Sequence, residues 1–78
     1  MVYPNPTPGH LNIRLTDALQ ANSSLNVTDV TGRTVKLLAL PANSINIHLD
    51  VKDLPAGRYF IRIINNTQLI NQSFVVIK

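Results

Sequence analysis

The chain has 78 residues, enough for one domain, and a chain of this length buries only about 60% of its unfolded surface. Hydrophobic residues make up 45% of it and aromatic residues 5%, which favours two thin packed sheets over a ligand cleft walled by rings. The absence of cysteine excludes disulfides, thiolate metal sites and cysteine nucleophiles. The net charge of +3 comes from scattered basic residues without interleaved aromatics, so we expect no nucleic-acid partner. No apolar stretch approaches the roughly 20 residues of a membrane helix, so we expect no membrane insertion.

Apolar and polar residues alternate through most of the chain. A period of two is typical of β-strands, and no apolar stripe of helical period occurs. In chain order, strands are expected at residues 11–15, 24–30, 33–40, 45–51, 58–64, 69–70 and 73–78. The stretch 58–64 is apolar on both faces except at Arg62, which is typical of a central strand, and residues 69–70 either form a separate short strand or begin the last one.

Turn-forming residues separate these strands. They lie at the Pro-rich start 3–9 and at residues 29–32, 41–44, 54–57 and 65–66. Gly32 can adopt the positive φ of a hairpin turn. In the segment 54–57, the ring of Pro55 fixes the φ of that residue and Gly57 lies near the corner, so a second turn is expected. Asn65 and Asn66 tolerate left-handed conformations, so a third hairpin turn is expected there. Strands that recur about every 10 residues predict an all-β sandwich of six or seven strands.

The residues that could carry chemistry are few. His10 and His48 are too few for a three-histidine metal site, and His48 is expected on a polar strand face in solvent. The four aspartates lack the spacing of a calcium loop and are expected to bond turn backbone instead. No serine lies in a G-x-S-x-G context, glutamate is absent, and the three glycines form no phosphate-binding pattern. We therefore expect no enzyme, no metal and no cofactor.

Four segments follow one another in a recognisable order. They are YPNPTPG at 3–9, DVTGRTV at 29–35, DLPAGRYFIRI at 53–63 and the terminal SFVVIK at 73–78. In this order they resemble the type A C-terminal sorting domain of proteins exported by the type IX secretion system of Bacteroidetes, over Tyr3 to Lys78. The residues that carry the resemblance are Tyr3, Pro4, Asn5, Pro6, Gly9, Gly32, Arg33, Leu54, Pro55, Gly57, Tyr59, Phe74, Val75, Val76, Ile77 and Lys78.

The resemblance implies a fold and a function. Domains of this family are immunoglobulin-like sandwiches of about seven strands at the C-terminus of a longer secreted protein. They act as signals that the outer-membrane translocon recognises after the cargo reaches the periplasm. A surface sortase then usually removes them, which leaves the cargo at the cell surface or secreted. By analogy, cleavage would fall upstream of Tyr3, and Phe74 to Lys78 would be the segment that the translocon reads.

Further expectations concern the ends of the chain and its partners. Met1 is expected to be an added initiator, with an upstream cargo domain absent from this single-domain chain. Gly32, Pro55 and Gly57 are expected to shape turns and so to be recognised only indirectly. A free edge on the terminal strand could add to a partner's sheet or form an edge-strand dimer. The alternative function is an adhesive or carbohydrate-binding module, which would need an exposed aromatic platform.

Overall fold

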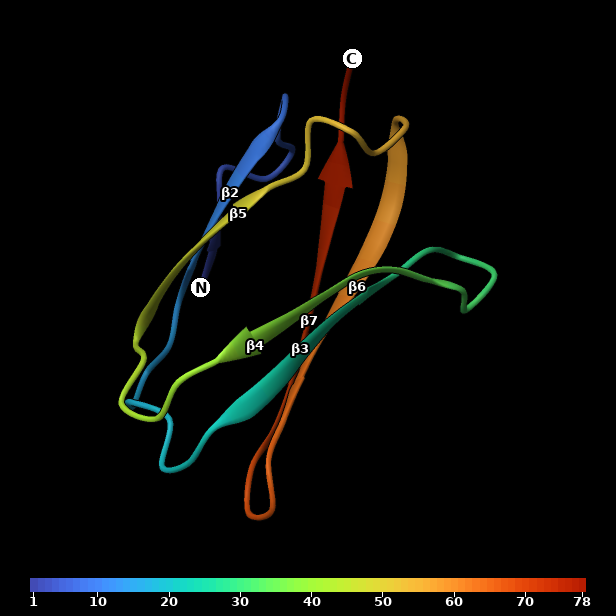
Figure 1. Cartoon of the computed structure of the whole chain (residues 1–78). Coiled ribbons are helices and arrows are strands. Elements are labelled where there is room, and N and C mark those ends of the chain that lie inside the picture. The colour runs from blue at the N-terminus through green and yellow to red at the C-terminus, as the bar shows by residue number, and fades with distance from the viewer.

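The computed structural model describes residues 1–78, and all of its regular structure is β-strand (Figure 1). The strands are β1 (Val2–Tyr3), β2 (His10–Arg14), β3 (Ser23–Thr28), β4 (Thr34–Leu40), β5 (Asn46–Asp50), β6 (Gly57–Ile64) and β7 (Leu69–Val76). The expected all-β class is confirmed, and residues 69–76 form one continuous strand.

The strands form two antiparallel sheets packed as a sandwich. One sheet has the order β1-β2-β5 and the other the order β4-β3-β6-β7. In Figure 1 the smaller sheet lies beside the larger one, with β7 and β6 on the side nearer the C-terminus. The stretch 58–64 is central as predicted, because β6 pairs with β3 on one side and with β7 on the other. This leaves β7 at one edge of the larger sheet and β4 at the other.

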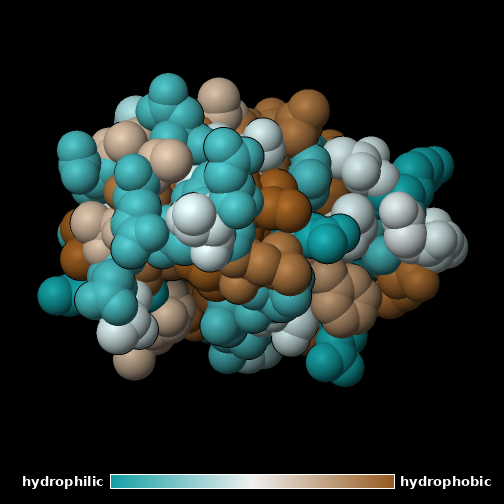
Figure 2. All heavy atoms as spheres, turned by 90° about the horizontal axis from the view of Figure 1, so that it is seen from below, coloured by the Kyte–Doolittle hydropathy of each residue, from teal (hydrophilic) through white to brown (hydrophobic).

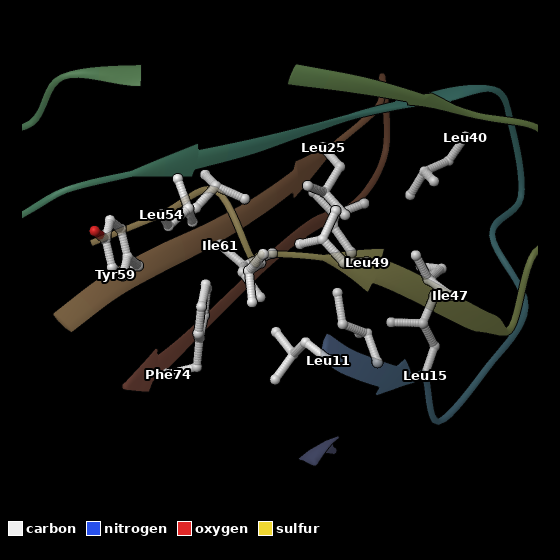
Figure 3. Close-up of a cluster of buried hydrophobic side chains, with 14 of the residues drawn as sticks. Leu11, Leu15, Leu25, Leu40, Ile47, Leu49, Leu54, Tyr59, Ile61 and Phe74 are labelled. Atoms are coloured by element: carbon white, nitrogen blue, oxygen red, sulfur yellow. The ribbon is translucent and has the colours of Figure 1, made fainter. Parts of the chain in front are cut away.

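Alternating residues of both sheets fill one core (Figure 3). Leu25 and Val27, expected together on one face, are both fully buried, as is Leu11 from the opposite sheet. The same period of two turns polar side chains to solvent, so His10 and His48 are exposed on the outer face of the smaller sheet. In most strands, the alternation of apolar and polar residues in the sequence therefore matches the alternation of buried and exposed side chains.

The pattern fails at the edges of the sandwich. Ile45 was expected to begin a strand with a buried face, but β5 begins at Asn46 and the side chain of Ile45 is 38% exposed. In β4, Leu37 is 69% exposed and Leu38 is 40% exposed. Leu37 pairs with Asn26 and faces outward, whereas Leu38 pairs with the buried Leu25 and is on the inner side of an edge strand that the three-stranded sheet does not fully cover.

The predicted turns occur, although one has a different physical basis. Gly32 has a φ of 88°, as the hairpin requires. Neither Asn65 nor Asn66 is left-handed, and the non-glycine residue with positive φ is Asn43 (71°). Asn65 instead closes its hairpin through its side-chain oxygen, which accepts hydrogen bonds from the amides of Thr67 (2.9 Å) and Gln68 (2.8 Å).

Amide side chains tie together the end of the sandwich that carries this hairpin. The Gln68 side-chain oxygen accepts hydrogen bonds from the backbone of Gln20 (3.0 Å) and from the side chain of Asn65 (2.8 Å). The amide of Ala42 donates to the side-chain oxygen of Asn22 (2.9 Å). Figure 2 views this end, where hydrophilic atoms cover much of the surface between smaller hydrophobic areas. The polar groups here are hydrogen-bonded to each other.

Candidate recognition site at the terminal strand

The last strand divides its residues between the core and the surface. Phe74 and Val76 are each 1% exposed, whereas Val75 is 37% exposed and Ile77, just past the strand, is 49% exposed. The C-terminus lies at the same end of the sandwich as the loop between β5 and β6 (Figure 1). The segment predicted to be read by a partner therefore presents alternate side chains outward at one end of an edge strand.

The N-terminal segment pairs with the end of this strand. The amide of Thr7 donates to the carbonyl of Val75 (2.8 Å), and the amide of Ile77 donates to the carbonyl of Thr7 (2.9 Å). The amide of Val75 also donates to the side-chain oxygen of Asn5 (3.0 Å). Two segments from opposite ends of the sequence thus form a short parallel bridge between the sheets. We call Asn5–Thr7 together with Val75–Ile77 the terminal clasp.

The clasp corrects the expectation of a free edge along the terminal strand. β7 pairs with β6 along its other side, and alternate residues of an antiparallel strand direct their backbone groups to opposite sides. Since Val75 faces the clasp, Ser73 and Asn71 direct their N–H and C=O groups to the same outer side, where no strand pairs with them. The unpaired part of the edge is therefore residues 69–73, upstream of the segment singled out from the sequence.

Thr7 is the clasp residue that sequence reasoning missed. It is fully buried, and its hydroxyl accepts hydrogen bonds from the amides of Gly9 (3.2 Å) and His10 (3.1 Å) while donating to the His10 carbonyl. These contacts turn the chain from the clasp into β2. The available signal was a hydroxyl residue followed by Pro8 and Gly9, a combination that favours a side-chain-bonded turn.

The glycine that follows has a packing role at the same end. Gly9 is buried, and a Cβ atom placed on it would lie 2.9 Å from Cγ of Lys52. The backbone of Lys52 is bonded in turn by the last residue, because Nζ of Lys78 donates to its carbonyl (2.7 Å). The segment that contains Gly9, the β5–β6 loop and the C-terminus therefore meet in one place.

The LPAGRY segment joins this end through Tyr59. Its hydroxyl donates to the carbonyl of Pro55 (2.6 Å), four residues upstream, and its ring stacks on Phe74 at a centroid distance of 5.6 Å. A tyrosine near the start of a strand that bonds back to preceding backbone is the tyrosine corner of immunoglobulin-like sandwiches. Leu54 is 5% exposed beneath the turn, and Gly57 has a φ of 154° that suits glycine. Motif residues and core residues are thus adjacent along β6 and β7.

The Gly32-Arg33 hairpin does not join this assembly. Its contacts are internal: Oδ1 of Asp29 accepts from the amides of Thr31 (2.9 Å) and Arg33 (3.1 Å), and Nε of Arg33 lies 3.4 Å from Oδ2. The hydrogen bond from the Thr31 hydroxyl, followed by these groups, lowers the pKa of Asp29 below its ordinary value. The expected turn-bonding role of this aspartate is confirmed, and the motif specifies a turn.

Another aspartate connects the far edge strand to the end that carries the clasp. Nζ of Lys36 in β4 lies 2.9 Å from Oδ1 of Asp53, which is in the β5–β6 loop. The hydrogen bond from Lys36 is the main reason why the pKa of Asp53 is lowered. Asp50 bonds the amide of Lys52 (3.0 Å), as expected for a turn residue.

The two histidines lie on neighbouring strands of the smaller sheet. Their rings stack with centroids 6.3 Å apart, and Nδ1 of His48 lies 2.9 Å from the side-chain oxygen of Asn12. No three His, Cys, Asp or Glu side chains gather closely enough to hold a metal ion. No helix of sufficient length and apolarity to cross a membrane is present.

Comparison with known families accounts for this arrangement. The model of the secretion system C-terminal sorting domain matches residues 1–78. The chain belongs to this family. The sorting domain is a C-terminal signal for type IX secretion, the export route of Bacteroidetes that takes proteins across the outer membrane to the cell surface or the medium. Its family implies an interaction with the type IX machinery and a linked upstream cargo.

A search among curated proteins found no match. The motif residues of the sorting domain do not all lie together in the structure. Residues 5–9 of YPNPTPG, LPAGRY and the terminal strand converge on the end that carries the clasp, whereas Tyr3 pairs with Asn12 in the smaller sheet and Gly32 and Arg33 form a separate hairpin. The carbohydrate-binding alternative has no support from the family match.

Proposed function

We propose that the type IX translocon reads the exposed residues of the segment Phe74–Lys78, namely Val75, Ile77 and Lys78. The observation that carries this proposal is that an edge strand presents these side chains outward at the end where three motifs meet. Phe74 and Val76 belong to the core and act by fixing the strand in place. Recognition of a folded edge explains why turn residues far away in the sequence belong to the same signal.

The unpaired backbone groups of Asn71 and Ser73 provide a second element of the same surface. An edge with free N–H and C=O groups accepts an added strand from a partner, with main-chain hydrogen bonds supplying affinity. We propose that a translocon strand pairs there. The clasp meanwhile holds the backbone of the last residues, so that their side chains remain exposed. The same edge would support a dimer of two sorting domains in the absence of the translocon.

The remaining steps follow from the family. The cargo passes through the periplasm before the sorting domain is read, and a surface sortase cuts upstream of Tyr3. The domain itself has no catalytic function in this scheme, and it requires no cofactor. These steps are part of the proposal.

The test is an export assay that leaves the core intact. Deletion of Phe74–Lys78 removes two core side chains and would unfold the domain, so surface substitutions are needed. Residues 3–78 are fused behind a periplasmic reporter in a type IX-competent host, with Val75→Ser and Ile77→Ser combined. The expected result is a reporter retained in the periplasm although circular dichroism shows a folded domain.

Two controls locate the effect. Leu69→Ser removes another exposed aliphatic side chain of β7 (52% exposed) outside the proposed segment, and His48→Ala alters the opposite sheet. Both are expected to export the reporter as the unmodified fusion does. Equal loss of export with Leu69→Ser, or normal export of the double variant, would contradict the proposal.

A further inference from the structure

The outer face of the larger sheet carries a row of three side chains from its central strand. Tyr59, Ile61 and Ile63 of β6 are buried, so Arg58, Phe60 and Arg62 face outward, and all three are exposed. Strand pairing places Arg62 between an asparagine on each side, Asn26 and Asn71. It places Phe60 between Thr28 and Ser73. The centre of this face is thus two arginines that flank one aromatic ring, with amides and hydroxyls beside Phe60 and Arg62 and the exposed side chain of Val75 beside Arg58.

This face has positive charge without a carboxylate to balance it. None of β3, β4, β6 and β7 contains an aspartate, and the chain has no glutamate. The structure contains two ion pairs, Arg33 with Asp29 and Lys36 with Asp53, both away from this face. Arg58 and Arg62 take part in neither ion pair, so their charge is open to a partner of opposite sign.

Phe60 and Arg62 border a hollow in the surface, and Arg58 lies outside its lining. It has a volume of about 700 Å³, and most of its lining residues are polar, including Asn26, Thr28, Thr34, Arg62, Asn71 and Ser73. Amide, hydroxyl and guanidinium groups all donate hydrogen bonds, and carboxylates are the acceptors that arginine binds most strongly. The hollow therefore suits an acidic ligand.

The position of the ring argues against a sugar as that ligand. Cζ of Arg58 lies 5.7 Å from the centroid of Phe60, over its face. A saccharide would need this face for stacking, and the arginine already occupies it. A protein segment needs only that the ring offer an apolar contact between two charges.

We propose that this face binds an extended acidic segment of a protein partner, with an apolar residue midway between two carboxylates four residues apart. Arg58 and Arg62 are separated by four residues of one strand, or roughly 13 Å, and an extended peptide repeats its side chains on one face at the same spacing. The partner pattern is acid-x-apolar-x-acid, which places its carboxylates on the arginines and its apolar side chain against the part of the Phe60 ring that Arg58 leaves exposed. The proposal goes beyond the reading of the terminal strand, since β6 variants leave residues 74–78 unchanged.

The test is a titration of the 78-residue chain, labelled with ¹⁵N, with short peptides observed by NMR. The probe is acetyl-Thr-Asp-Thr-Val-Thr-Asp-Thr-amide, and its control has the same composition with the two aspartates adjacent. Exposed ion pairs are weak, so dissociation constants of the order of millimolar are expected. The spaced peptide should shift the amide signals of Phe60, Arg62 and Asn71, and raising the salt from about 20 to about 300 mM should weaken binding.

Matched variants decide whether the arginines are responsible. Arg58→Gln and Arg62→Gln should each weaken binding about two- to fivefold. Arg14→Gln, at an exposed arginine of the other sheet, should leave it unchanged. The proposal is overturned if the adjacent-aspartate peptide binds equally well or if Arg14→Gln has the same effect. Binding of oligogalacturonate without binding of the peptide would also overturn it and assign the face to an acidic saccharide.

Discussion

Replacement of Thr7 by valine tests whether the terminal clasp stabilises the sorting domain. Valine has nearly the same shape as threonine but lacks the hydroxyl, so the buried amide of Gly9 and the backbone of His10 lose their partner. The hydrogen bonds to the His10 backbone are partly buried, whereas the hydrogen bond from the Gly9 amide is buried. A buried donor left without a partner costs about 1–3 kcal/mol, so Thr7→Val should lower the free energy of unfolding by about 2 kcal/mol.

The matched control is Thr7→Ser, which keeps the hydroxyl and removes one methyl group. Its cost should be about 1 kcal/mol, as for other deletions of one buried methyl. Urea denaturation followed by circular dichroism measures both changes, and with a slope of about 1 kcal/mol per molar the midpoints should differ by about 1 M. Hydrogen exchange at the Ile77 amide, which donates to Thr7, should accelerate more in the valine variant. If valine is tolerated as well as serine, the hydroxyl does not hold the clasp.

Three further predictions concern single contacts. Tyr59→Phe removes the hydrogen bond to Pro55 while keeping the ring, so chemical denaturation should show a loss of about 1 kcal/mol, and Tyr3→Phe, at a 43% exposed ring, should show none. Gly32→Ala forces a side chain into positive φ and should cost about 1–2 kcal/mol of unfolding free energy, with a smaller loss for Gly32→Asn; equal losses would argue against backbone strain. The pKa of Asp29 is lower in the folded chain, so its contribution to stability is present above about pH 4 and disappears as the pH falls through the folded value. Asp29→Asn should therefore flatten the dependence of the urea midpoint on pH in that range.

Local rules explain how much of the fold could be predicted from the sequence. Side chains alternate across a strand whatever its partner, so the buried set of β2, β3 and β6 follows from a period of two. The ring of Pro55 restricts its φ, whereas Gly32 and Gly57 can adopt positive φ because they lack a side chain. Their turns could therefore be predicted without knowing which strands pair. These properties depend on a few neighbouring residues and are therefore visible in sequence order.

The order of motifs also carried the function. YPNPTPG, the Gly32-Arg33 turn, LPAGRY and the terminal apolar strand indicated a type IX sorting domain, and the family match over residues 1–78 confirms it. What each motif does was less accessible. Asn65 was expected to adopt a left-handed backbone, and its side chain closes the hairpin instead. Asparagine can form a turn either through a left-handed backbone or through a side-chain hydrogen bond, and its position in the sequence does not show which.

The pairing of distant segments was decided only by the tertiary structure. Nothing in the sequence order of Thr7 and Val75 shows that they exchange backbone hydrogen bonds, since backbone groups are the same in every residue. The clasp covers the last residues of the terminal strand and leaves Asn71 and Ser73 unpaired, which reverses the expected position of the free edge. The sequence by itself determined that this chain is an all-β sorting domain, through periodicity and motif order. Its exposed surface depends on which strands lie at the sheet edges, and only long-range packing decides that.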